Sequence, residues 1–421
     1  MQKLISSFGL VAVLCTQTAL AAINIPSNGS DGALVVAENT VIDLSLASTN
    51  RWDADNSARP GTGTYDADKW AVVFHYTSVS IEAGATVTFI NHPSGAPVVW
   101  LVQSNVTING TVCLDGEDGR IAPYLSKPGP GGSRGGAASF GAGAGYGDGF
   151  GVGGGGTAGA NTTPSGGSYG SNGVGPRTGG QYGNASNMPL IGGSGGSGRH
   201  GHPDDGGGAG GGAILIACSS VLSIGGAVTA NGGSHNYWAS GGSGGAIRLV
   251  CETLSGAGDV LAQGGKNGNQ GIGGNGRIRI ERVTNTTNDD SFAVAPDPSV
   301  VELGDGDTPL IWLPTNGPTV QIVKIGGNDA PADPRAGFGA IGADVTLPQV
   351  TSTTVVIETR YVEAESAVTV RATPRSNGNY TEVPATGAPE VISENEPVLR
   401  WTVNVPVQDG YSAIQVKVVR P

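Results

Sequence analysis

The sequence contains few charged and few aromatic residues. Charged residues make up 13% of the 421 positions, and aromatic residues make up 5%. Asp and Glu (34) outnumber Lys and Arg (22), which gives a formal net charge of −12. Contacts with phosphate need clustered basic residues, so we expect no nucleic-acid partner. After the first 21 residues no apolar run is long enough to cross a bilayer, and we expect a protein that does not span a membrane.

Cysteine is also scarce, and the only apolar run typical of a targeting segment lies at the N-terminus. Lys3 precedes the apolar stretch 10–14, and Ala19-Leu20-Ala21 fits a signal-peptide cleavage site. These features predict a signal peptide over 1–21, a mature chain that begins at Ala22, and a secreted or cell-surface location. Three cysteines remain after cleavage, and an exported protein can form disulfides between them.

Glycine, by contrast, is abundant. The chain has 74 Gly residues without a Gly-X-Y period, which excludes a collagen helix. Val, Ile and Thr cluster in short runs bounded by Gly, Asn, Asp and Pro, a pattern that favours strands and turns. The sequence therefore predicts an all-β protein.

Three segments share one pattern, and they align on Gly116, Gly232 and Gly264. They span 98–116, 213–232 and 246–264, and a truncated fourth copy spans 276–283. The aligned apolar positions are Val106, Leu222 and Leu254, and Val112, Val228 and Val260. Apolar residues two apart face one side of a strand, and stacked copies bury a continuous core. We therefore predict a parallel β-helix (solenoid), with a sandwich of similar strands as the alternative.

The predicted domain order follows changes in composition along the chain. The order is a signal peptide (1–21), an N-terminal cap with the first β-helix coils (22–118), a Gly-rich insertion (119–212), further β-helix coils (213–283), a linker (284–308) and an immunoglobulin-like β-sandwich (309–421). The insertion has almost no large apolar residues. It is either a disordered loop or a set of packed polyproline-II segments in which Gly lets backbones approach closely.

A family resemblance supports this outline. Residues 74–116, followed by the motifs GGGAGGGAILI, GGSGGAIRL and GGNGRIRIE, resemble secreted glycine-rich bacterial β-helix surface proteins of unknown function. The resemblance covers roughly 70–282 and implies a β-helix in a bacterial envelope or extracellular setting. It implies no activity. The segment ADVTLP (343–348) is similar to sandwich repeats of bacterial surface proteins.

Two clusters of potential metal ligands stand out. The first holds His200, His202, Asp204 and Asp205, which together could bind Zn²⁺ or another transition metal. The second is acidic, and Ca²⁺ is the cofactor that its oxygen ligands would suit. Its members are Asp115, Glu117 and Asp118. A polar loop edge or a solvated turn is the alternative for each cluster.

Two further pairs are candidates for binding or cross-linking. Tyr237 and Trp238 interrupt a Gly-rich stretch, where they could stack on a sugar ring or cover the end of a coil. Cys218 and Cys251 occupy nearly equivalent positions in adjacent copies. They could form a disulfide or pack as buried thiols.

No catalytic constellation is evident, so the sequence favours a non-catalytic structural or adhesive protein outside the cytoplasm. The alternatives are a polysaccharide-binding protein and a β-helix carbohydrate-active enzyme, a lyase or a hydrolase. Arg248 and Arg279 recur at equivalent positions, but a row of exposed arginines would explain them without catalysis. Expected partners are polysaccharides or other envelope components, together with further copies of the chain.

Overall fold

The computed structural model contains 25 strands and one short 3₁₀ helix among the residues that it describes. These are residues 23–421 without 139–146, 158–162, 200–203, 236–237, 267–270, 286–291, 305, 336–342, 376–377 and 394–395. The all-β prediction is confirmed. None of the described helical residues form a segment long and apolar enough to cross a membrane.

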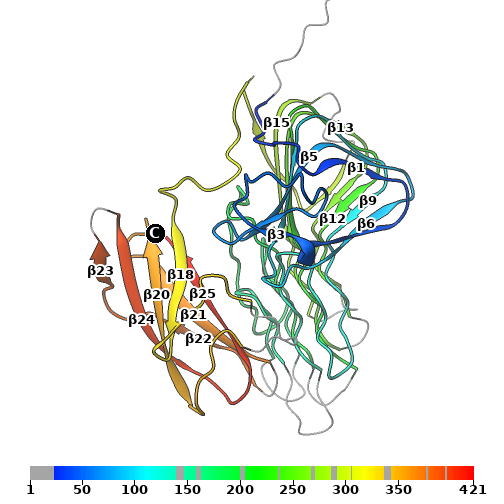
Figure 1. Ribbon diagram of the computed structural model, residues 1–421. Coiled ribbons are helices and arrows are strands. Elements are labelled where there is room, and N and C mark those ends of the chain that lie inside the picture. Colours follow the sequence, from blue (N-terminus) through cyan, green and yellow to red (C-terminus); the bar gives the residue numbers. More distant parts are fainter. Residues whose placement is uncertain are drawn as a thin grey trace, which may run out of the picture.

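The main sheet has eleven strands, and most of its pairs are parallel (Figure 1). Its strands are β1 (Gly32–Val36), β3 (Ser48–Thr49), β4 (Thr64–Asp66), β5 (Ala71–Ile81), β7 (Val98–Val102), β8 (Val106–Ile108), β10 (Ala213–Cys218), β11 (Val221–Ile224), β13 (Ala246–Gly256), β15 (Arg277–Asn285) and β17 (Ser299–Glu302). The long strands β5 and β13 each pair with two shorter strands, β5 with β7 and β8, and β13 with β10 and β11. Because β7 also pairs with β10, and β8 with β11, these six parallel strands close into a ring.

The predicted β-helix solenoid is therefore wrong as a description of the fold. The main sheet closes on itself through β5 and β13 and is accompanied by separate sheets. The repeats nevertheless identified residues that pair, because Leu222 lies opposite both Val106 and Leu254. The aligned spacing could not show that one 11-residue strand would bridge two shorter ones.

A second sheet faces the same core. It contains β16 (Ala293–Ala295), β14 (Asp259–Leu261), β12 (Ala227–Thr229), β9 (Thr111–Cys113), β6 (Thr86–Ile90) and β2 (Thr40–Asp43), in that order and all parallel. The aligned residues Val112, Val228 and Val260 point inward and are buried. The 3₁₀ helix η1 (Leu44–Leu46) adds the fully buried Leu44 to this core.

The glycine-rich segments form an ordered array that we call the glycine lattice. It comprises residues 131–136, 147–156, 165–168, 192–198, 206–212, 231–234, 240–245, 264–265 and 271–276. The amides of Gly208 and Gly211, three residues apart, donate to the carbonyls of Ser240 and Ser243 at 2.8 and 2.9 Å. A three-residue period is that of polyproline II. Figure 1 shows these segments as long arms that extend side by side from the strands.

Close backbone contact explains why the lattice needs glycine. A Cβ atom on Gly242 would lie 2.0 Å from the carbonyl oxygen of Ala209, and one on Gly155 would lie 1.8 Å from that of Ser165. Real side chains do not approach so closely. These contacts favour the packed polyproline-II alternative for the lattice segments of 119–212, and segments outside that range, such as 240–245, belong to the same array.

The close packing of the lattice predicts that an added methyl group will destabilise the protein. We expect Gly242→Ala to lower the free energy of unfolding by about 3 kcal/mol, because the new methyl group must displace backbone atoms. Gly304→Ala is the control, since its Cβ would meet only the carboxylate of Asp307 at 3.3 Å or more. Chemical denaturation of both variants measures the difference. Equal stability of the two would contradict the close packing.

The C-terminal residues form two antiparallel sheets around a separate core (Figure 1). One sheet contains β19 (Asn328–Asp329), β18 (Thr319–Ile325), β20 (Ser352–Arg360), β24 (Val398–Pro406) and β23 (Glu390–Ser393). The other contains β22 (Thr381–Pro384), β21 (Ala367–Pro374) and β25 (Ser412–Val419). Trp401 is buried between them, and its indole N–H donates to the hydroxyl of Thr359 at 3.0 Å. The immunoglobulin-like assignment stays a prediction.

One buried arginine joins this C-terminal domain to the glycine lattice. Arg371, 2% exposed, donates to the carbonyls of Gly149 and Gly154 at 3.2 and 2.9 Å. Its guanidinium lies 3.5 Å from the ring centroid of Tyr380. The Tyr380 amide in turn donates to the fully buried carboxylate of Asp148 at 2.7 Å. We call this group the arginine contact.

The arginine contact gives a second stability prediction. Arg371→Ala removes a buried cation that bonds the carbonyls of Gly149 and Gly154 and pairs with Glu382 at 3.3 Å, and the loss of such a buried charged partner costs about 3 kcal/mol. We also expect faster hydrogen exchange in the lattice segment 147–156. Arg360→Ala is the control, because Arg360 makes a surface ion pair with Glu396 at 3.5 Å, worth under about 1 kcal/mol. Identical exchange in the two variants would show that the contact does not hold the domains together.

Candidate functional site

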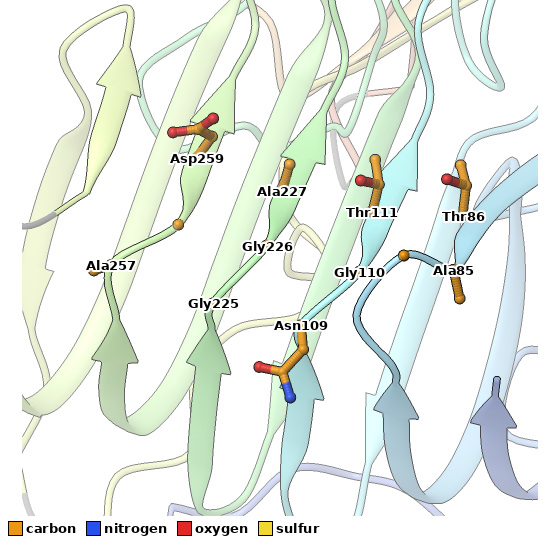
Figure 2. Close-up of a pocket in the computed structure, with 12 residues that line it drawn as sticks. Ala85, Thr86, Asn109, Gly110, Thr111, Gly225, Gly226, Ala227, Ala257 and Asp259 are labelled. Carbon is orange, nitrogen blue, oxygen red and sulfur yellow. The ribbon is translucent and has the colours of Figure 1, made fainter. Parts of the chain in front are cut away.

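A shallow groove of about 360 Å³ crosses four neighbouring turns of the two parallel sheets (Figure 2). We call it the turn groove. The turns connect β5 to β6, β8 to β9, β11 to β12, and β13 to β14. Its lining residues are Gly84, Ala85, Thr86, Asn109, Gly110, Thr111, Gly225, Gly226, Ala227, Ala257, Gly258 and Asp259.

Glycine allows the four turns to stack closely and forms the floor of the groove. A Cβ on Gly226 would lie 1.9 Å from the carbonyl oxygen of Gly110, and one on Gly258 would lie 2.1 Å from that of Gly226. The same carbonyls accept hydrogen bonds at 2.8 Å from the amides of Ala227 and Asp259. The floor is therefore fixed by backbone contacts, and the side chains that follow it on each strand are placed at regular intervals.

Those side chains form a row along the rim of the groove. Thr86, Thr111, Ala227 and Asp259 are register partners on successive strands, and Figure 2 shows them side by side. Asn109 projects from the turn before Thr111. Among the described residues, the side chains of Asn109, Thr111 and Asp259 have no hydrogen-bond partner. Their polar atoms are thus available to a ligand.

A second row of hydroxyl groups lies on the strands that lead into the same turns. Ser80, Thr107, Ser223 and Ser255 are register partners on β5, β8, β11 and β13. All four are half-buried, while their sequence neighbours, such as Ile108 and Leu222, point into the core. Small polar side chains therefore occur on both sides of the turns.

The turn groove was not predicted from the sequence, although the sequence contains a signal for it. Each rim residue immediately precedes an inward valine, as Thr111 precedes Val112 and Asp259 precedes Val260. The repeat alignment therefore placed the rim residues opposite one another. Their mixed identities hid the row, because Thr, Ala and Asp share no single chemistry.

The predicted transition-metal cluster is not assembled among the described residues. His200 and His202 lie outside them, and Asp204 is exposed. The buried Asp205 has its carboxylate 3.6 Å from the guanidinium of Arg199 and 3.9 Å from the imidazole of His235. Within the described ranges no three His, Cys, Asp or Glu residues gather in a way that could hold a metal ion.

The three residues of the predicted calcium cluster accept hydrogen bonds from different segments of the chain. Asp115 accepts from the amide of Asn231 at 2.6 Å, and Asp118 accepts from the amide of Ser234 at 2.7 Å. Glu117 accepts from the amide of Lys127 at 2.9 Å. These carboxylates tie neighbouring turns together and point to different partners, so the structure does not bring them into one site.

The aromatic and cysteine pairs have different outcomes. Tyr237 lies outside the described residues. Trp238 is 49% exposed, and the guanidinium of Arg199 lies 4.6 Å from its ring centroid. Cys218 and Cys251 are free thiols in the structure, so the predicted disulfide is absent there. Both sulfurs belong to the hydrophobic core, and burial raises their pKa values.

The recurring arginines are structural rather than exposed. Arg248 is only 1% exposed, and it donates to Glu281 at 2.9 Å and to the carbonyl of Leu310 at 2.6 Å. Arg279 donates to the same carboxylate at 3.1 Å. The expectation of an exposed arginine row was wrong for Arg248, because residues near 310 cover this part of the main sheet.

A buried histidine lies where the C-terminal domain meets the first strands. His92 stacks on Tyr65 with 3.9 Å between ring centroids, and its Nδ1 accepts hydrogen bonds from the amide and hydroxyl of Ser94. The hydroxyl of Tyr65 donates to Asp333 at 2.6 Å. Burial, and then the nearby positive charge of Arg335, lower the pKa of His92 to about 4.

Comparison with protein-family models, with curated proteins and with solved structures found no match.

The pKa of His92 predicts a loss of stability in acid. In the unfolded chain His92 takes up a proton below about pH 6.5, whereas the folded protein resists protonation until about pH 4. The unfolded state binds more protons in this window, so stability falls as the pH falls. We expect this residue to account for roughly 3 kcal/mol between pH 6.5 and 4. His92→Asn keeps an acceptor for Ser94 but cannot titrate.

The measurement is the free energy of unfolding of both proteins at several pH values between 7 and 4. The difference between wild type and His92→Asn should change steadily across this range, since other titrating groups are common to both. A constant difference would contradict the assignment.

Proposed function

We propose that this chain is an exported, non-catalytic structural or adhesive scaffold. The observation that carries the proposal is the glycine lattice. Its segments contact one another through backbone atoms, so no flexible side chains separate them. Such an array favours a rigid body that holds its surfaces at fixed distances. The arginine contact supports the same conclusion, because it joins the C-terminal domain to the lattice through buried polar groups.

The location belongs to the same proposal. The predicted signal peptide over 1–21 and the resemblance to secreted glycine-rich bacterial surface proteins both favour export. The net charge of −12 suits a soluble protein in that setting. Envelope components, polysaccharides in particular, and further copies of the chain are the proposed partners.

The scaffold proposal predicts retention without turnover. The mature protein, beginning at Ala22, should co-sediment with isolated bacterial envelopes and should release no soluble sugar from them, with or without added Ca²⁺. Sedimentation and reducing-end assays on the same samples measure the two properties. Released sugar that increases with time would contradict the non-catalytic part, and absence from every envelope pellet would contradict the adhesive part.

Polysaccharide binding is the second candidate function, and the turn groove favours it. Its rim offers hydroxyl, amide and carboxylate groups that have no hydrogen-bond partner among the described residues. An adhesive scaffold and a polysaccharide-binding protein are compatible, since binding of this kind would be the means of adhesion.

A further inference from the structure

We propose that the turn groove binds an extended, uncharged polysaccharide that runs across the four strands and hydrogen-bonds through its hydroxyl groups to the rim residues. The inference rests on the second candidate function and names the ligand class for that site. Shape, hydrogen-bonding capacity and charge support it in turn.

The shape of the groove suits a chain more than a compact molecule. Pockets for small ligands enclose most of the ligand surface, whereas the turn groove is shallow and open. Its rim residues recur once per strand, and neighbouring strands lie about 4.8 Å apart. An extended chain can contact the rim residues of several strands at once, which a compact small molecule cannot.

The rim groups have the capacity to bind sugar hydroxyls. A threonine hydroxyl and an asparagine amide each donate and accept, and a carboxylate accepts. Thr111, Asn109 and Asp259 provide these three groups, and none of them is hydrogen-bonded to another part of the described chain. A ligand can therefore use them without breaking an internal bond.

Charge distinguishes between classes of polysaccharide. Asp259 is the one charged residue among those lining the groove, and Glu82 is exposed in the turn before Gly84. Chains that carry carboxylates or sulfates would be repelled by these groups and would find no lysine or arginine in the lining. Uncharged chains avoid this repulsion and still use every polar group of the rim.

The central experiment compares uncharged and acidic polymers. Native gel electrophoresis of the mature protein is run with soluble uncharged glucan, xylan or galactomannan in the gel, and in parallel with polygalacturonate or alginate. At least one uncharged polymer should retard the protein, and the acidic polymers should not. Retardation by acidic polymers alone, or by none of the uncharged ones, would overturn the proposal.

Two substitutions test whether the polysaccharide binds in the turn groove. Ala227→Leu fills the groove from the middle of the rim without adding a polar or aromatic group, and it should weaken binding at least tenfold. Thr229→Leu is the matched control, because it puts the same side chain on the same strand two residues away, outside the lining, and it should bind as wild type. Equal affinity of the two variants would overturn the proposal.

A second variant tests the same site without the risk that a larger side chain disturbs folding. Asn109→Ala combined with Thr111→Val removes two rim donors without adding bulk, and it should also weaken binding at least tenfold at an unchanged melting temperature. Asp259→Asn keeps a polar group and should change the affinity for an uncharged chain less than about threefold. A large loss with Asp259→Asn and binding of an amine-bearing chain would instead indicate a cationic ligand and reject the uncharged class.

The envelope assay distinguishes this inference from the proposed scaffold function. If Ala227→Leu still co-sediments with envelopes like wild type, adhesion uses another surface and only the groove assignment fails. If wild type fails to co-sediment but binds a purified uncharged chain through the groove, the groove assignment stands and the adhesive scaffold fails.

Discussion

Backbone-to-backbone contact in the glycine lattice is the constraint on which the rest of the structure depends. At Gly155, Gly208 and Gly242 a single added carbon would fall about 2 Å from a carbonyl oxygen of another segment. The hydrogen bonds between lattice segments recur at every third residue, and they require the backbones to lie this close together. The same requirement explains the composition, since long segments devoted to close backbone approach leave little room for charged, aromatic or branched side chains.

The lattice also sets the register of the strands. Three lattice residues directly precede the strands β10, β13 and β15: they are Gly212, Gly245 and Gly276. The Ala246 amide donates to the carbonyl of Gly212, and the Arg277 amide donates to that of Gly245. The first residues of the three strands, Ala213, Ala246 and Arg277, are then register partners. A shift of one residue in the lattice would turn the inward Ile and Leu side chains of these strands outward.

The sequence predicted the local pattern better than the overall architecture. Val112, Val228 and Val260 were aligned correctly, because alternation and turn glycines report directly on which residues face a core. The closing of β5 and β13 into a ring was not predictable, since it depends on strand length and on pairing partners far apart in the sequence. The contacts of the candidate ligands were not predictable either, because composition does not show that Asp115 and Asp118 each accept a hydrogen bond from the backbone amide of another turn.

The two ends of the parallel strands differ in how they use their polar side chains. At the lattice end, Asp115 and Asn231 accept hydrogen bonds from backbone amides of the next turn. These side-chain oxygens therefore bond within the molecule. At the turn groove, neighbouring turns are joined by backbone hydrogen bonds, with the Gly110 and Gly226 carbonyls as acceptors. Side chains such as Thr111 and Asp259 are therefore not needed for cohesion there. Because glycine performs the structural task at this edge, the residues beside it are free to vary, and the repeat presents them at regular intervals to the solvent.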